Sequence, residues 1–201
     1  MKLLLFSDLH CDEDASRSLV SRAGQFDVLV GAGDFGRCRQ FVDKAIRILE
    51  AVTKPTVLVP GNAESVEELT AACKDWPAAH VLHGTGTTID GIDFFGIGGG
   101  IPVTPFGDWS YDFTEDEATE LLADCPTNCV LVTHSPPKGV VDTDSSGKSF
   151  GSAAVRKTVE QKSPRLVVCG HVHACWRQEA KIGATPVVNA GPVGVEWLLN
   201  Q

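Results

Sequence analysis

The chain has 201 residues, of which 43% are hydrophobic and 21% are charged, and its formal net charge is -9. This length and composition indicate a single globular domain over residues 1–201 that is large enough to bury a core. The excess of acidic residues argues against a protein that binds nucleic acid through a basic surface, because negative charges repel the phosphate backbone.

The chain shows no sign of a membrane or secreted protein. No window approaches the ~20 consecutive apolar residues that a membrane-spanning helix needs. The apolar run Leu3–Phe6 is too short for a signal peptide and predicts a buried first strand instead. The seven cysteines form an odd set without a paired CxxC spacing, which is typical of a reduced setting. We therefore expect a cytoplasmic protein without a membrane partner.

Five short apolar runs, rich in Val, Ile and Leu, each end abruptly in polar residues. Continuous apolar runs of this length predict strands that are buried on both faces. Helical periodicity lies between them, and the alternation predicts an α/β domain with a mainly parallel sheet. The runs cover residues 3–6, 28–30, 57–59, 130–132 and 166–168, and the predicted helices cover residues 39–52, 65–74, 115–123 and 152–161. Thr114 and Glu117 have the spacing of a capping box.

The middle and the end of the chain predict antiparallel additions to this sheet. Residues 89–97 have the pattern of a hairpin around Asp90-Gly91. Residues 176–199 predict three short strands, broken at Gly183 and at Gly191-Pro192. The architecture is therefore expected to be mixed rather than purely parallel.

Two long irregular segments, residues 98–113 and 135–151, follow predicted strands. Long ordered loops in a compact domain are often functional. We expect both loops to wall a pocket, with Trp109 and Tyr111 as candidates for its lining.

Side chains that can bind a metal follow all five apolar runs. Because ligands bind at the carboxyl ends of the strands in α/β sheets, these side chains can converge although they are far apart in the chain. The members of two pairs are two residues apart, and an extended backbone would point both members of a pair the same way. The candidates are Asp8 and His10, Asp34, Asn62, His134, and His171 and His173.

Glycines come directly before three of these candidates, Asp34, Asn62 and His171, and allow the backbone to turn tightly there. The mixture of imidazole, carboxylate and amide donors suits Mn, Fe, Zn, Co or Ni better than Ca. Seven ligands are too many for one ion, and they are consistent with two ions that share a carboxylate.

The ordered series resembles the signature of the calcineurin-like metallophosphoesterases, over essentially the whole chain. The resemblance implies a four-layer αββα sandwich with two mixed β-sheets in a single domain. It also implies two divalent metal ions, Mn most of all, with Fe, Zn, Ni, Co or Mg as alternatives. The motifs that carry it are Asp8-x-His10, Gly33-Asp34, Gly61-Asn62, His134 and Gly170-His171-x-His173.

The resemblance also implies residue roles. Asp8, His10, Asp34 and His173 would hold the first ion, and Asp34, Asn62, His134 and His171 would hold the second. Asp34, Asn62 and His134 would serve catalysis, in which a metal-bridging hydroxide attacks the phosphorus of a small-molecule phosphate ester. The activity implied is that of a metal-dependent phosphoric ester hydrolase.

The third motif departs from the family pattern. Many members have a histidine after the Gly-Asn pair, usually assigned to protonation of the leaving group or to phosphate binding, and here Ala63 stands there. Some small members without this histidine resemble phosphodiesterases and others have become binding scaffolds, and we expect a phosphodiester rather than a monoester as substrate. Glu64, which follows, is expected in the first turn of the next helix, where the helix dipole favours a carboxylate.

Other functions are weaker hypotheses. A non-catalytic protein-interaction scaffold on the same fold would be expected to have lost ligands, and this chain retains all seven. A structural zinc site over residues 169–175 has the wrong spacing. The oligomeric state stays open, with pairing along an edge of the antiparallel C-terminal strands as one route to a homo-oligomer.

Overall fold

Alternate side chains of the first strand, β1 (Lys2–Phe6), pack into two different cores in the computed structural model, which describes residues 1–199. Leu3 and Leu5 pack in a core between two sheets, and Leu4 and Phe6 pack in a second core beneath helices. This is the period of two that a strand imposes. A run that is apolar at every position therefore predicts a strand with a layer on each side, as is found here.

The first sheet has five strands in the order β11-β1-β2-β3-β4. Strands β1 to β4 are parallel to one another, and β11 pairs antiparallel with β1. The bounds are Val28–Ala32 for β2, Thr56–Val59 for β3, Ala79–Val81 for β4 and Val195–Leu198 for β11.

The second sheet has six strands in the order β5-β6-β7-β8-β10-β9, with parallel pairing from β6 through β7 and β8 to β10. The hairpin β5–β6 and the strand pair β9–β10 add the antiparallel edges, which confirms the predicted mixed architecture. The bounds are Thr85–Ile89 for β5, Ile92–Ile97 for β6, Val130–Thr133 for β7, Leu166–Cys169 for β8, Glu179–Ile182 for β9 and Thr185–Asn189 for β10.

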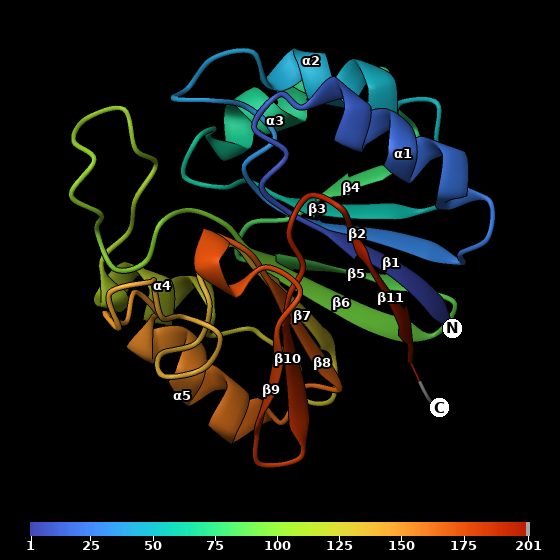
Figure 1. The fold of residues 1–201 in the computed structure, drawn as a ribbon. Coiled ribbons are helices and arrows are strands. Elements are labelled where there is room, and N and C mark those ends of the chain that lie inside the picture. Colours follow the sequence, from blue (N-terminus) through green and yellow to red (C-terminus); the bar gives the residue numbers. More distant parts are fainter. Residues whose placement is uncertain (200–201) are drawn as a thin grey trace.

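Helices cover the outer face of each sheet, which gives the predicted αββα order of layers (Figure 1). The first three helices pack on the five-stranded sheet, and the last two pack on the six-stranded sheet. The bounds are Glu13–Ala23 for α1, Val42–Leu49 for α2, Val66–Ala72 for α3, Glu115–Leu121 for α4 and Ala153–Lys162 for α5. The predicted capping box of Thr114 and Glu117 begins α4.

Two helices differ from the prediction. The second helix begins at Val42 rather than at residue 39, because Phe41 has a φ of 61°, a left-handed conformation that a right-handed helix cannot include. The first helix, α1, was not predicted. Its apolar stripe is thin, with only Ser16, Leu19 and Ala23 buried, so its sequence has little helical periodicity.

The two long loops follow strands β6 and β7, as predicted, and contain only isolated bridges among the residues described. In Figure 1 both lie on the same side of the molecule, beyond the carboxyl ends of the parallel strands. Within residues 1–199, no helix has the length and apolar character that a bilayer crossing requires.

Candidate metal centre

All seven predicted ligand residues come together where the two sheets present the carboxyl ends of their parallel strands. Five of them follow a strand directly or within a few residues: Asp8 follows β1, Asp34 follows β2, Asn62 follows β3, His134 follows β7 and His171 follows β8. His10 lies in the turn after Asp8, and His173 begins a short 3-10 helix, His173–Cys175. The prediction that these side chains converge is therefore confirmed.

The backbone reaches this convergence through turns and not through extended pairs. Asp8, His10, Asp34 and His171 all have positive φ values, between 46° and 66°. Such conformations are strained for residues other than glycine and gather at functional sites. The expectation that extended backbone aligns Asp8 with His10, and His171 with His173, is wrong.

Hydrogen bonds between neighbouring loops hold these turns. The backbone N–H of Asp8 donates to the Gly33 carbonyl over 2.9 Å, and that of His10 donates to the Asp34 carbonyl over 2.9 Å. The turn after β1 is thereby fixed against the turn after β2. Because backbone groups make these bonds, the ligand positions depend on the fold more than on side-chain packing.

The glycines before the ligands permit close approach. A Cβ atom on Gly33 would lie 2.6 Å from the Cα of Gly61, and one on Gly170 would lie 2.6 Å from Oδ2 of Asp8. No side chain fits at Gly33 or Gly170. The turn that carries Asp34 can therefore pack against Gly61, and the turn that carries His171 against Asp8, only through glycine.

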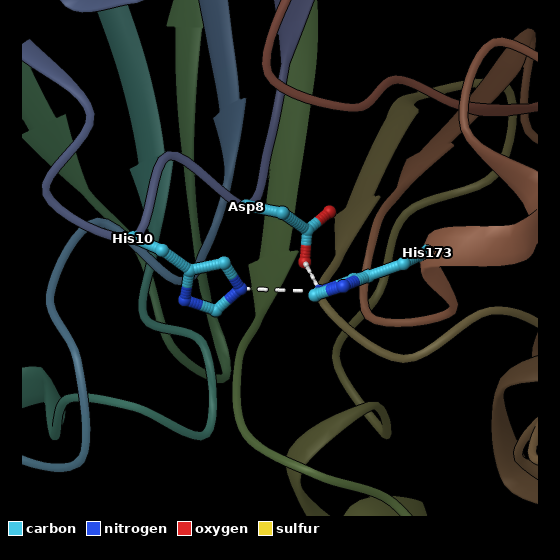
Figure 2. A group of neighbouring side chains, drawn as sticks. All are labelled: Asp8, His10 and His173. Atoms are coloured by element: carbon cyan, nitrogen blue, oxygen red, sulfur yellow. Dashed lines mark hydrogen bonds and ion pairs between the residues drawn. The ribbon is translucent and has the colours of Figure 1, made fainter.

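Asp8, His10 and His173 form the more exposed part of the cluster, which we call the open half (Figure 2). Nε2 of His10 lies 3.1 Å from Nε2 of His173, and Oδ1 of Asp8 lies 3.7 Å from the same His173 nitrogen. The imidazoles of His10 and His173 are 30% and 51% exposed, whereas the Asp8 carboxylate is buried.

Asn62, His134 and His171 form the buried half. Oδ1 of Asn62 lies 3.2 Å from Nε2 of His134 and 3.1 Å from Nδ1 of His171. The two ring nitrogens are themselves 3.2 Å apart. Burial and the neighbouring imidazoles hold the pKa of His171 well below its usual range, so this ring is neutral and has a free lone pair.

Asp34 lies between the two halves and has one oxygen near each. Oδ1 is 3.4 Å from Nε2 of His134, and Oδ2 is 3.6 Å from Nε2 of His10. Burial, with a further contribution from the Asp8 carboxylate, raises the pKa of Asp34 to about 7. This carboxylate is therefore unfavourable as an anion without a compensating cation.

Two residues of the cluster, His134 and Asn62, turn a donor away from it and an acceptor toward it, which fits a bound cation. Nδ1 of His134 lies 2.7 Å from the Ala32 carbonyl and donates to it, so Nε2 is the nitrogen that faces the cluster. The amide nitrogen of Asn62 donates to Oγ of Ser110 over 3.0 Å, which turns its oxygen inward. Ligand atoms at right angles around an ion with bonds of about 2.1 Å lie about 3 Å apart, close to the spacing of the buried half.

Asp8 is oriented in the same manner. Its Oδ2 accepts from the hydroxyl of Ser7 and from the indole N–H of Trp176, the latter over 3.2 Å. Its Oδ1 accepts from the backbone N–H of His171 over 3.1 Å and faces His173. The Trp176 ring also packs against the His173 ring, with 4.5 Å between centroids. Trp176 was not among the predicted site residues, because its contacts to Asp8 span most of the chain and leave no local pattern.

Glu64 binds the backbone of the turns that carry the cluster. It was predicted in the first turn of the next helix, but it lies before the N-cap of that helix. It precedes Ser65, the N-cap of α3, and is buried. Its carboxylate accepts from the backbone N–H groups of Asp34, Phe35, Gly36 and Gly61. Burial and the nearby Asp34 raise the pKa of Glu64 to about 7. Glu64 thus fixes the turns after β2 and β3 to each other.

A cavity of about 460 Å³ opens in front of the cluster. Both long loops line it, as predicted. The lining includes Trp109, as expected, but does not include Tyr111, which instead packs against His83 and Phe113. The lining residues are His10, Asp34, Asn62, Phe106, Trp109, Asp144, Ser145, Phe150, His171, Val172, His173 and Ala174.

The alternative zinc site at residues 169–175 is not formed. The thiol of Cys169 donates to the Val188 carbonyl, and the thiol of Cys175 donates to the Thr143 carbonyl. Both thiols therefore have backbone partners, and neither belongs to a group of possible metal ligands among the described residues.

Comparison with known proteins places the chain in a family. A family model described as the calcineurin-like phosphoesterase superfamily domain matches residues 1–198. A UPF0046 protein of Caenorhabditis elegans is 38% identical over 98 residues, which cover 46% of this chain and 31% of that protein. The match thus spans about a third of the length of this curated relative.

Solved structures share the fold at low sequence identity. TT1561 of Thermus thermophilus is 21% identical, with a TM-score of 0.77 over 94% of this chain and 88% of that one. A dimetal phosphatase from Danio rerio is 11% identical, with a TM-score of 0.65 over 96% of this chain and 88% of that one. Likeness at this level of identity establishes the fold.

Proposed function

The chain belongs to the calcineurin-like phosphoesterase superfamily, a family of metal-dependent phosphoesterases, and from this premise we propose that it hydrolyses phosphodiesters at a centre of two metal ions. The observation that carries the proposal is the convergence of seven side chains, of which His134 and Asn62 turn their hydrogen-bond donors away from the cluster. Lone carboxylates and imidazoles are common on protein surfaces, but two buried carboxylates close together, Asp8 and Asp34, are unfavourable unless a cation lies beside them.

Each half of the cluster would hold one ion. The open half, completed by Oδ2 of Asp34, supplies two imidazoles and two carboxylates. The buried half, completed by Oδ1 of Asp34, supplies two imidazoles, one amide oxygen and one carboxylate. These mixed N/O sets suit Mn²⁺ among the first-row metals, and availability would decide among Mn, Fe, Zn, Ni and Co, with Mg as a further alternative.

The bound ions would supply Lewis acidity and lower the pKa of water. The chain itself would orient the reaction. Asp34 reaches both halves, and the contacts to Ser110 and to the Ala32 carbonyl would keep the Asn62 amide and the His134 ring in place during the reaction. In the overall reaction, the oxygen of water bonds to phosphorus, the P–O bond to the leaving alcohol breaks, and that alcohol takes up a proton.

Two observations support a diester over a monoester. Ala63, where many family members have histidine, is buried and offers only its backbone N–H, which donates to Oδ1 of Asp34 over 2.8 Å. Among the described residues, the cavity lining holds no lysine or arginine that could neutralise the second charge of a monoester. A diester carries one negative charge and makes the smaller demand on the site.

A comparison of two nitrophenyl substrates tests the proposal. The metal-free protein, reconstituted with Mn²⁺, is assayed on a nitrophenyl phosphodiester and on nitrophenyl phosphate, with Asp34→Asn as the control. Mn²⁺-dependent turnover that favours the diester and disappears in Asp34→Asn is the expected result. No hydrolysis of either substrate with two ions bound would contradict the hydrolase and favour the interaction scaffold. A preference for the monoester would contradict the diester assignment alone.

A further inference from the structure

The cavity in front of the ligand cluster has a composition that the proposed chemistry does not require. Three of its lining side chains are large aromatics: Phe106 and Trp109 from the loop of residues 98–113, and Phe150 from the loop of residues 135–151. A phosphodiester reaction needs the ligand cluster and water. An aromatic wall contributes to neither, so it points to contact with another part of the substrate.

Two of these rings already form a flat surface. The rings of Phe106 and Trp109 are stacked, with centroids 5.6 Å apart and planes only 15° from parallel. Phe106 is nevertheless 51% exposed, so it is one of the few large apolar side chains that the core does not take up. Covering exposed apolar surface beside a cavity with a ligand is favourable, because that surface is removed from water.

The charge of the cavity lining affects which charged groups a bound ligand can carry. Apart from the ligand residues, the charged side chain in the described lining is Asp144. One of its oxygens, Oδ1, accepts from the backbone N–H groups of Ser146 and Lys148 and from the Ser146 hydroxyl. The carboxylate is therefore held in place, and it disfavours a second anionic group in the cavity.

Basic side chains gather at a different place. A smaller cavity of about 230 Å³ shares Phe106, Phe150 and His171 with the first, and its lining includes Lys138 and Lys148. Nζ of Lys148 lies 4.8 Å from the centre of the Phe150 ring. The two cavities that meet at these rings thus differ in charge, and the one that contains Trp109 lacks the lysines.

We propose that the cavity beside the ligand cluster selects phosphate esters in which one ester group carries a flat aromatic ring without negative charge. The inference rests on the proposed function, since the phosphate must lie at the ligand cluster for the ring to reach Trp109 and Phe106. It makes Trp109 and Phe106 specificity-determining residues, which contact the ester group and not the reacting phosphorus.

Binding of phosphonates tests the inference without turnover. Phenylphosphonate, cyclohexylphosphonate and methylphosphonate are used as their monomethyl esters, which carry one negative charge like a diester, and their affinities for the Mn²⁺-loaded protein are measured by calorimetry. We expect phenylphosphonate to bind about tenfold more tightly than methylphosphonate and more tightly than cyclohexylphosphonate, because stacking adds to apolar burial. Trp109→Ala should abolish the advantage of the ring while methylphosphonate affinity stays unchanged.

Phe41→Ala is the matched control, because Phe41 is 53% exposed, like Phe106, and lies outside both cavities. It should leave all affinities unchanged. Equal affinity for phenyl and methyl phosphonate in the wild type, or no binding of either, overturns the inference. Binding of 4-carboxyphenylphosphonate as tight as that of phenylphosphonate overturns its charge selectivity.

The outcomes separate the two proposals. Tighter binding of the aromatic phosphonate without hydrolysis of either nitrophenyl substrate would support the inference and contradict hydrolysis. Diester turnover together with equal phosphonate affinities would sustain hydrolysis and contradict the inference.

Discussion

The two halves of the ligand cluster have similar donors but different surroundings. In the buried half, His134 is fully buried and its ring is fixed by the Ala32 carbonyl. In the open half, His173 is 51% exposed and its ring lies beside Trp176, His10 and the Asp8 carboxylate. If two ions bind as proposed, the buried half would hold its ion in the core and the open half would hold its ion nearer the surface.

This difference has a consequence for metal binding. A ligand held by packing and hydrogen bonds loses little conformational entropy when an ion binds, and an exposed ligand loses more. We therefore expect two binding steps of unequal affinity, with the buried half filled first. The following changes test whether the halves differ in this way.

The largest effect is expected at Asp34, the residue that both halves share. Asp34→Asn keeps the shape of the side chain but removes the charge that faces His134 and His10. We expect turnover to fall by more than the roughly 10–100-fold that loss of an outer-shell partner costs, because a direct ligand is lost at both sites. The bound metal, measured by elemental analysis after gel filtration, should fall from two ions per chain to one or none; two retained ions would contradict the shared role.

The next effect distinguishes the two halves by how much each contributes to the free energy of unfolding. His134→Ala leaves a cavity at a fully buried position and leaves the Ala32 carbonyl without its donor, so the metal-free protein should lose about 3 kcal/mol of unfolding free energy. His10→Ala changes a partly exposed side chain and should cost less than about 1 kcal/mol. Urea unfolding in the presence of a chelator measures both, and equal losses would show that the two halves are equally embedded.

Metal addition should stabilise the folded chain by an amount similar to the loss expected for His134→Ala. An ion at 100 times its dissociation constant contributes about 2.7 kcal/mol, which for a chain of this length raises Tm by about 5–10 °C. Thermal unfolding with Mn²⁺ and with chelator gives the shift. His10→Ala should retain most of it because the buried half still binds, and His134→Ala should lose most of it. The reverse order would mean that the open half binds first.

Local patterns were sufficient to predict the buried strands and the edge at which the ligand candidates gather, whereas the four-layer order came from the resemblance to the family. Runs such as Leu3–Phe6, apolar at every position, require a layer on each face. Polar residues directly after such runs lie at one edge of the sheets. Neither inference needs knowledge of which residues meet across the chain.

The supporting contacts could not be predicted, because they join distant segments. Glu64 lies before a helix, where the helix dipole is a sufficient explanation for a carboxylate, and its role appears only when the turns after β2 and β3 meet. The left-handed turns at Asp8 and His171 follow from the same packing and have no local signal, since these are not glycine positions.

The smallest effect is expected at Trp176, which acts on the open half through Asp8. Trp176→Phe keeps an aromatic ring beside His173 and removes the N–H that donates to Oδ2 of Asp8. We expect the weaker of the two Mn²⁺ binding steps to lose about tenfold in affinity, the low end of what outer-shell partners contribute, while the tighter step and the urea midpoint stay unchanged. Calorimetric titration of the metal-free protein separates the steps, with Trp197→Phe on β11 as the control. Loss of the tighter step would show that Asp8 orients the buried half as well, and the division of the cluster into two independent sites would then be wrong.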